Sequence, residues 1–236
     1  MKAIILAAGR GERMRPLTDT LPKPLLPAGG KPLIVHHIER LVHAGITELI
    51  INTAWLGEKI EATLGDGSRW GATIRYSHEE HALETAGGIA RALPLLGDAP
   101  FLVVNGDVYI EWDFRRALAI RDTLLERNLD FWLMLVPNPP HNPKGDFAVN
   151  SAGVLQRAGA DALTYAGIGV YHPRFFRAVA SDAPARLAPL LAAGIDAGRG
   201  LGERFGGEWR DIGTAERLAH LDAYLLPGEN VKRSML

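Results

Sequence analysis

Glycine and basic residues follow directly after the first apolar run of the chain. Residues 3–8 are apolar, and residues 9–18 have the sequence Gly-Arg-Gly-Glu-Arg-Met-Arg-Pro-Leu-Thr. A turn of this kind exposes consecutive backbone N–H groups, and glycine lets the main chain come close to an anion. Lys23 lies between Pro22 and Pro24, which restrict its backbone, and it adds a positive charge from a stiff segment. The pattern predicts a polyphosphate site.

The spacing excludes two common glycine-rich motifs. A Walker loop requires Gly-Lys followed by a hydroxyl residue, which this segment lacks, and a dinucleotide fingerprint requires a third small residue where Met14 stands. A nicotinamide-dependent dehydrogenase is therefore disfavoured. An ordinary strand-to-helix turn with solvated charges remains an alternative. Three cations close together, Arg13, Arg15 and Lys23, favour phosphate binding over that alternative.

Two aspartates follow segments that could bring them to one place. Asp107 comes soon after the apolar run 101–104, and in an open parallel sheet the carboxyl ends of the strands face the ligand crevice. A carboxylate there suits Mg²⁺, which leaves most of its positions to phosphates and water. Asp211 lies much later, before a predicted helix, and two converging carboxylates can hold cations against a triphosphate. The alternative for each is a turn or capping role, with Thr214 a competing cap.

These segments resemble the signature of the sugar-1-phosphate nucleotidyltransferases. The resemblance begins with residues 6–18 and 22–27 and covers nearly the whole chain. Its further segments are Leu-Glu-Thr-Ala-Gly-Gly-Ile at 83–89, Val-Asn-Gly-Asp at 104–107, Lys-Gly-Asp-Phe at 144–147 and Trp-Arg-Asp-Ile-Gly-Thr at 209–214. It implies that a phosphate oxygen of a sugar 1-phosphate attacks the α-phosphorus of a nucleoside triphosphate in line, and that pyrophosphate leaves. The protein must then align two anions and neutralise developing charge.

The resemblance also implies roles for individual residues. It makes Arg13, Lys23 and Asp107 catalytic, and it makes Asp107 and Asp211 the ligands of Mg²⁺. The residues expected to bind the nucleotide are Ala8, Gly9, Gly11, Glu12, Arg13, Lys23, Thr85, Gly87 and Gly88. The residues expected to bind the sugar are Asn105, Gly145, Asp146 and Tyr165. Structural alternatives stay open for two of these groups: the paired glycines could shape the entry to a helix, and Tyr165 could pack in the core.

The expected substrates follow from the same resemblance. It favours UTP and N-acetylmuramate 1-phosphate, a reaction of bacterial cell-wall recycling. GTP with mannose 1-phosphate, and dTTP or UTP with glucose 1-phosphate, are alternatives. Family members more often have glycine where this chain has Glu84, which leaves the nucleobase open. A non-catalytic nucleotide-sugar sensor is the alternative from another class, and such a protein would be expected to lose Arg13, Lys23 or a metal carboxylate.

Composition limits the class of protein. The chain has 236 residues, of which 47% are hydrophobic and 22% are charged, with a formal net charge of −1 and no cysteine. No apolar run is long enough to span a bilayer, and the N-terminal apolar stretch runs straight into charged residues, so we expect no membrane partner and no signal peptide. The charge balance gives no field that would attract nucleic acid. We expect a cytoplasmic monomer or small homo-oligomer without disulfides.

Apolar runs alternate with helical patterns through the first part of the chain. The expected strands are residues 3–6, 48–52, 72–76, 101–105 and 131–136. The expected helices are residues 32–44, 57–64, 87–93 and 113–126, the last with Asp113 as its N-cap. Such alternation predicts an α/β protein. With the resemblance, it indicates a Rossmann-like nucleotidyltransferase fold, with a mixed, mainly parallel sheet and helices on both faces.

The second half is less regular. Residues 137–143 are rich in proline, and strand-like pieces follow at 147–150, 154–157 and 164–171. We expect a small β-rich sugar-binding insertion at the edge of the sheet, with a passive linker as the alternative. Helical patterns cover 174–180, 185–197 and 215–225. The expected organisation is one nucleotidyltransferase domain, residues 1–226, followed by a C-terminal tail, residues 227–236.

Several other residues receive structural explanations. The segment His-Glu-Glu-His at 78–81 is one residue shorter than a metalloprotease motif and is expected to be a solvated loop. His36, His37 and His43 lie on one predicted helix and are expected at its surface or in packing. The tryptophans at 55, 70, 112 and 132 are scattered, so they form no stacking platform for single-stranded nucleic acid.

Overall fold

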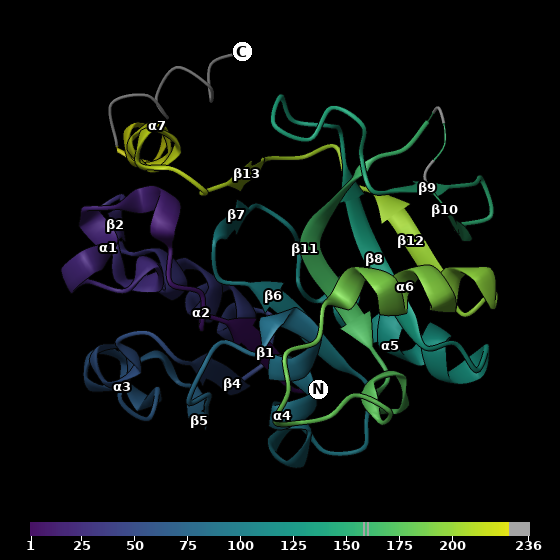
Figure 1. The fold of residues 1–236 in the computed structure, drawn as a ribbon, viewed down its shortest axis with the longest axis horizontal. Coiled ribbons are helices and arrows are strands. Elements are labelled where there is room, and N and C mark those ends of the chain that lie inside the picture. Colours follow the sequence, from purple (N-terminus) through teal and green to yellow (C-terminus); the bar gives the residue numbers. More distant parts are fainter. Residues whose placement is uncertain (158, 160, 227–236) are drawn as a thin grey trace.

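Short apolar, β-branched runs form the strands at the centre of the molecule. The computed structural model describes residues 1–157, 159 and 161–226. Seven strands form one sheet in the order β12-β8-β11-β6-β1-β4-β5 (Figure 1). Their bounds are β1 Ala3–Leu6, β4 Glu48–Thr53, β5 Thr73–His78, β6 Phe101–Asn105, β8 Phe131–Val136, β11 Thr164–Tyr171 and β12 Gly200–Arg204.

The sheet is mixed and mainly parallel, as predicted. β1 pairs in parallel with both β4 and β6, β4 pairs in parallel with β5, and β12 pairs in parallel with β8. β11 is antiparallel to both of its neighbours, β6 and β8. Leu6 at the end of β1 lies opposite Asn52 on one side and Asn105 on the other, so these three strands end at the same level.

Helices cover both faces of the sheet, which confirms the predicted layering. The α-helices are α1 Leu17–Thr20, α2 Leu33–His43, α3 Gly57–Leu64, α4 Glu84–Leu96, α5 Arg116–Glu126, α6 Leu187–Asp196 and α7 Ala215–Leu225. The 3-10 turns are η1 Glu12–Met14, η2 Lys23–Leu25, η3 Ser68–Trp70 and η4 Pro173–Phe176. Ile5 faces a core shared with α2, α3 and α5, whereas its neighbour Ile4 faces a core shared with α4 and α6. Burial on both faces explains why the strands are continuous apolar runs.

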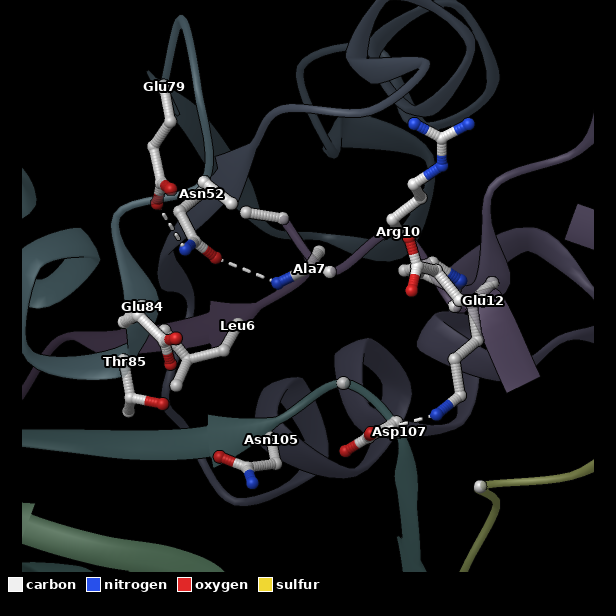
Figure 2. Close-up of a pocket in the computed structure, with 18 of the residues that line it drawn as sticks. Leu6, Ala7, Arg10, Glu12, Asn52, Glu79, Glu84, Thr85, Asn105 and Asp107 are labelled. Carbon is white, nitrogen blue, oxygen red and sulfur yellow. Dashed lines mark hydrogen bonds and ion pairs between the residues drawn. The ribbon is translucent and has the colours of Figure 1, made fainter. Parts of the chain in front are cut away.

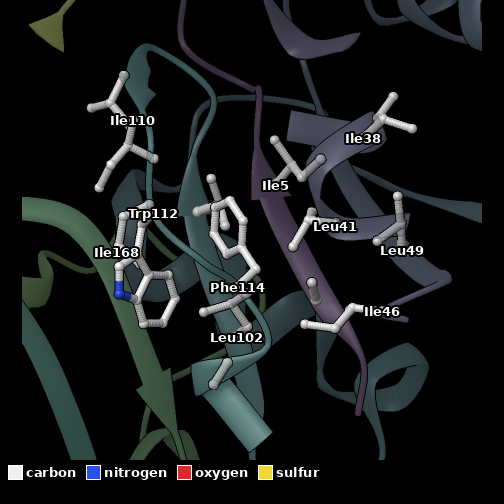
Figure 3. Packing of buried hydrophobic residues seen from close by; sticks show 14 of the residues in the cluster. Ile5, Ile38, Leu41, Ile46, Leu49, Leu102, Ile110, Trp112, Phe114 and Ile168 are labelled. Carbon is white, nitrogen blue, oxygen red and sulfur yellow. The ribbon is translucent and has the colours of Figure 1, made fainter. Parts of the chain in front are cut away.

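The larger core fixes the position of the central strands. Ile5 and Leu102 from the sheet pack with Ile38 and Leu41 of α2, and Phe114 closes the same cluster (Figure 3). A fully buried side chain of this size contributes about 1.5–3 kcal/mol. The strand ends that carry polar residues are therefore held by a rigid layer beneath them.

Three two-stranded ribbons lie outside the main sheet. They pair β2 Pro27–Ala28 with β3 Lys31–Pro32, β7 Val108–Ile110 with β13 Trp209–Asp211, and β9 Phe147–Val149 with β10 Leu155–Arg157. The β9–β10 ribbon is the small β-rich insertion expected beside the sheet, and a bridge between Val154 and Leu201 attaches it to β12. Helix α7 packs through Leu218 and Leu221 on a third core that includes Met14 of the glycine-rich loop.

Some predicted elements were wrong in position or kind. Helix α4 begins at Glu84 rather than at Gly87, so the paired glycines lie inside it. Asp113 does not cap α5, which begins at Arg116; its carboxylate accepts from the N–H of Arg115 in the preceding turn. Residues 174–180 form no α-helix, because η4 ends at Phe176. Strands β2, β3, β7, β12 and β13 were not predicted. The predicted tail, residues 227–236, lies outside the described residues.

Candidate active site

The carboxyl ends of β1, β4 and β6 open into a cavity of about 540 Å³. Figure 2 shows Asn52 and Asn105 on opposite walls, with the start of the glycine-rich loop between them. Predicted site residues that line the cavity are Ala8, Gly9, Gly11, Glu12, Arg13, Lys23, Thr85, Asn105 and Asp107. Residues far apart in the sequence therefore meet where an open α/β sheet places its ligands.

The glycine-rich loop depends on Gly11. This residue has φ +69°, and a Cβ on it would lie 2.9 Å from Cγ2 of Thr18. The Thr18 hydroxyl donates a 2.8 Å hydrogen bond to the Gly11 carbonyl, which pins the turn. Only glycine takes this backbone conformation and close approach without strain. The loop then enters η1 with Arg13 exposed at the cavity wall.

Lys23 and Asp107 form an ion pair at the cavity. Nζ of Lys23 lies 2.8 Å from Oδ2 of Asp107, and the lysine is only 8% exposed. A buried ammonium is costly unless it is paired, so the carboxylate also keeps the lysine in place. The Asp107 side chain is 41% exposed and remains accessible from the cavity.

Asp211 reaches the same region through the β7–β13 ribbon. The N–H of Ile212 donates a 2.8 Å hydrogen bond to the backbone carbonyl of Asp107, so the two aspartates lie on paired chains. Oδ2 of Asp211 is 2.5 Å from Arg217 Nη1 and 2.9 Å from His141 Nε2. Asp211 does not itself line the cavity, although its neighbour Gly213 does.

Gly213 links Asp211 to the glycine-rich loop. A Cβ on Gly213 would lie 3.2 Å from Nη2 of Arg13 and 3.2 Å from Oδ1 of Asp211. The Arg13 guanidinium and the Asp211 carboxylate thus border the same small residue. Thr214 caps α7, since its hydroxyl accepts from the N–H of Arg217, and Asp211 is free of that capping role.

A buried network forms the wall opposite Asp107. Oδ1 of Asn52 accepts a 2.7 Å hydrogen bond from the N–H of Ala7, and its Nδ2 donates 2.7 Å to Oε1 of Glu79 (Figure 2). Oε2 of Glu79 accepts from the N–H of Leu83. Glu79 is 5% exposed and lines the cavity, so the expectation that residues 78–81 form a solvated loop was wrong for Glu79, although the other three residues are exposed. No local signal in the sequence indicates this burial, because its partner Asn52 lies in β4, far from Glu79 in the sequence.

Gly87 and Gly88 do not line the cavity. A Cβ on Gly88 would lie 2.6 Å from Oε1 of Glu79, and a Cβ on Gly87 would lie 2.7 Å from the carbonyl oxygen of Ala183. Gly88 lets α4 pack closely behind the Glu79 network, and Gly87 lets α4 pack closely against the backbone at Ala183 and Ala185. Thr85 and Glu84, one turn earlier, are the α4 residues at the cavity itself.

Glu84 has a backbone conformation that favours glycine. Its φ is +58°, which costs a residue with a Cβ on the order of 1 kcal/mol. Its carboxylate is exposed at the cavity wall, and Oε1 lies 3.9 Å from Nε of Arg186, a pair too solvated to hold it firmly. Strain at a cavity-lining position indicates a functional constraint.

The predicted sugar-binding residues fall into two groups. Asn105 lines the cavity, and Gly167, at φ +77°, leaves room for its side chain. Asp146 is outside the cavity lining; its Oδ2 accepts 2.8 Å from the N–H of Tyr165 and its Oδ1 accepts from Asn142. Gly145, at φ +66°, shapes the turn before Asp146.

The ring of Tyr165 packs away from the cavity. Its hydroxyl lies 3.0 Å from the Tyr171 hydroxyl, and burial raises the pKa of both phenols. The ring is partly buried against the core shared by α4 and α6. The contacts of this side chain favour the packing alternative over direct sugar contact.

Among the residues that the structure describes, no group of three or more His, Asp or Glu side chains is arranged to hold a metal. Asp107 and Asp211 are two carboxylates, and two side chains do not make up such a group. Within the same residues, no helix is long and apolar enough to cross a bilayer.

The family model for nucleotidyl transferases matches residues 2–226. The chain therefore belongs to the nucleotidyl transferase family, which confirms the resemblance drawn from its motifs. It is 52% identical over 226 residues to the N-acetylmuramate alpha-1-phosphate uridylyltransferase of Neisseria meningitidis serogroup B, covering 94% of this chain and 97% of that protein. It is 33% identical to the protein of the same name from Caulobacter vibrioides, covering 94% and 96%.

A solved structure shares the fold. A Bacillus anthracis protein assigned as a glucose-1-phosphate thymidylyltransferase, crystallised with sucrose, superimposes with a TM-score of 0.83. The two chains are 22% identical, and the match covers 96% of each. At that identity the likeness supports the Rossmann-like architecture.

Proposed function

We propose that this protein joins UTP to N-acetylmuramate 1-phosphate and releases pyrophosphate. The observation that carries the proposal is the single cavity that unites the glycine-rich loop with the Lys23–Asp107 ion pair. The full-length likeness to the Neisseria meningitidis protein supports both substrates. The reaction would serve cell-wall recycling in the cytoplasm, where nucleoside triphosphates are made.

The reaction needs alignment and charge neutralisation rather than a protein nucleophile. An oxygen of the sugar phosphate forms a bond to the α-phosphorus while the bond from that phosphorus to the pyrophosphate oxygen breaks. Arg13 and the N–H groups after Gly11 would hold the phosphates, and Lys23 would offset the negative charge that develops near Asp107. Both arginine and lysine positions are supplied by the first turns after β1.

The carboxylates fit Mg²⁺. Asp107 and Asp211 offer oxygen ligands from paired chains, and within the described residues Oδ1 of each accepts no hydrogen bond. Two protein oxygens with phosphates and water completing the shell suit this ion. When bound, it would reduce the repulsion between the two anionic substrates. Arg217 and His141 would keep Asp211 oriented through its other oxygen.

The nucleobase and the sugar would occupy opposite ends of the cavity. Thr85 and the backbone of residues 8–9 would border the base, with Gly87 and Gly88 supporting that wall from within α4. Asn105 would contact the sugar, and the turn at Gly145–Asp146 would complete the sugar side. The lactyl group of N-acetylmuramate requires space that the β9–β10 insertion can border.

A substrate matrix tests the proposal. Purified protein is incubated with Mg²⁺, each of UTP, GTP and dTTP, and each of N-acetylmuramate, mannose and glucose 1-phosphates, and pyrophosphate release is measured. We expect the highest kcat/KM for UTP with N-acetylmuramate 1-phosphate. Preference for another pair would reassign the substrates within the family. Binding of UTP with no pyrophosphate from any pair would instead support a sensor.

A further inference from the structure

Arg10 occupies the cavity without a role in the site described so far. It lies between the two glycines of the loop, lines the cavity and is exposed. Its guanidinium carbon stands 4.4 Å from the ring centroid of Trp55. The Trp55 indole N–H in turn donates a 3.1 Å hydrogen bond to the carbonyl oxygen of Thr18. The arginine is thus supported by an aromatic platform that is tied to the same loop.

The charge of Arg10 has no acidic partner in the described part of the chain. Arg15 pairs with Asp19 and Lys23 pairs with Asp107, whereas Arg10 faces the cavity with its charge uncompensated. A guanidinium stacked by its face on a ring keeps its N–H donors available at its edge, and these donors match phosphate oxygens. Arg10 is therefore prepared to bind an anion.

The position of Arg10 indicates which phosphates it meets. Figure 2 shows its side chain extending away from Asp107 and Asn105, on the other side of the glycine-rich loop. In an in-line displacement, the leaving group departs on the side opposite the attacking oxygen. With the sugar phosphate on the Asn105 side, pyrophosphate lies toward Arg10.

We propose that Arg10 binds the β- and γ-phosphates of the nucleoside triphosphate and the pyrophosphate product, and that Trp55 is its positioning residue. This inference rests on the proposed nucleotidyl transfer. As the bond from the α-phosphorus to the bridging oxygen breaks, its electron pair stays on pyrophosphate, and the fixed charge of Arg10 stabilises that anion. Arg10 transfers no proton.

The reverse reaction isolates this contact, because pyrophosphate is then a substrate of its own. We expect Arg10→Ala to raise the KM for pyrophosphate roughly tenfold to a hundredfold, the range for losing a charged hydrogen-bonded contact. The KM for the nucleoside triphosphate should rise in the forward direction, while the KM for the sugar phosphate stays unchanged. Arg10→Lys should restore part of the effect.

Arg69 provides the matched control. Its guanidinium carbon lies 3.8 Å from the ring centroid of Trp70, so it makes the same kind of stack, outside the cavity. Arg69→Ala should leave the KM for pyrophosphate at its wild-type value. If Arg10→Ala and Arg69→Ala alter only thermal stability, and to a similar degree, the Arg10 stack is structural and the proposal is overturned.

Trp55 is tested by comparing two variants. Trp55→Leu removes the aromatic face and should raise the KM for pyrophosphate with a smaller change in kcat, whereas Trp55→Phe keeps a ring and should retain most of the affinity. Equal KM values for both variants and the wild type would contradict the positioning role. If Trp55→Leu fails to fold, the Phe variant and Arg10→Ala still decide the outcome. A wild-type protein inactive with every substrate pair would refute the proposed function, whereas an active wild type with an unaltered Arg10→Ala variant refutes only this inference.

Discussion

Lys23 carries its charge on an almost fully buried side chain. Pro22 and Pro24 stiffen the segment around it, and Asp107 receives its ammonium at 2.8 Å. Such a charge needs little reorganisation when an anion arrives, which is the property that makes preorganised charges effective in catalysis. The Lys23–Asp107 ion pair therefore holds the buried lysine in place and also keeps its positive charge at the cavity.

Removal of the Lys23 charge should reduce turnover strongly. We expect Lys23→Gln to lower kcat/KM for nucleotidyl transfer by a factor of roughly 100 or more, since a preorganised charge at the reacting phosphate is lost. Steady-state pyrophosphate release measures the effect. Lys31→Gln is the control, because Lys31 pairs with Glu39 outside the cavity. Similar losses in both variants would contradict a specific role for Lys23.

The backbone strain at Glu84 should lower the free energy of unfolding of the protein. We expect Glu84→Gly to raise the free energy of unfolding by about 1 kcal/mol, because glycine adopts φ +58° without a Cβ penalty. Chemical denaturation measures the change. Asn128→Gly, at φ 52° and outside the cavity lining, should gain less because asparagine tolerates this conformation. A destabilised Glu84→Gly protein would show that the Glu84 side chain makes a contact worth more than the strain.

At the residue scale, sequence patterns located the groups that follow strands. Asp107 and Asn105 were predictable because a strand end in a parallel sheet faces the ligand side. Glu79 was not, because a carboxylate between two histidines looks solvated until Asn52 and the N–H of Leu83 are brought to it by tertiary contacts.

At the scale of elements, α2 ties the core to the ribbon beside the site. Nε2 of the buried His37 donates a 2.7 Å hydrogen bond to the carbonyl oxygen of Val108, next to Asp107. Burial is the main cause that lowers the pKa of His37 to about 4, and the bond to Val108 opposes it only in part. The imidazole therefore stays neutral in the folded protein down to about pH 4.

This histidine should make stability depend on pH. The unfolded chain binds a proton at His37 below its ordinary pKa of 6.5, while the folded protein does not until about pH 4, so stability falls as pH drops through this window. Between pH 7 and pH 5 the loss should be about 2 kcal/mol. Urea denaturation of wild type and His37→Asn at both pH values measures it, and the variant should show a smaller loss. His43→Asn, exposed on the same helix, should retain the wild-type pH dependence.

Elements with local signals were predicted well, and elements that exist only through pairing were missed. The apolar runs of β1, β6 and β8 are visible in the sequence because both faces of each strand are buried. β12 begins Gly-Leu-Gly and has little strand character alone, yet it pairs along its length with β8. The paired glycines of α4 looked like the entry to a helix, yet they lie inside it. Gly88 is required there because a Cβ would collide with the side chains of Glu79 and Asn52.

At the scale of the whole molecule, the fold brings together acidic and basic groups without a large net charge. The formal net charge is −1, yet one cavity is lined by the cations Arg10, Arg13 and Lys23 and by the carboxylates Glu12, Glu79, Glu84 and Asp107. The cations suit phosphates, and the carboxylates suit hydrogen-bond donors and bound cations. A triphosphate would therefore meet fixed charges of both signs as it enters the cavity.

Metal removal should separate catalysis from stability. We expect a chelator to abolish pyrophosphate release while leaving the melting temperature of the substrate-free protein unchanged, because no cluster of three or more suitable side chains holds a metal within the described residues. Activity should return when Mg²⁺ is added in excess. A clear fall in melting temperature on chelation would instead indicate a structural ion.

The overall architecture was predictable because the alternation of strands and helices and the sequence motifs indicate the same fold. The assembly of the second carboxylate, Asp211, into the site was not predictable in this way. The residues Trp209–Asp211 carry no local sequence pattern typical of a strand. They form β13 by pairing with β7. The position of Asp211 beside Asp107 is thus a property of the whole chain rather than of either segment.

The β7–β13 ribbon also sets the order in which the site is completed during synthesis. A ribosome that has released the first two hundred residues has already made the phosphate loop, its lysine and the first carboxylate. The second carboxylate comes with β13, the last strand within residues 1–226, followed by the helix whose Arg217 holds it. Chains that stop before β13 would therefore carry the phosphate loop without a complete pair of carboxylates, and nucleotidyl transfer should begin only after Arg217 has been made.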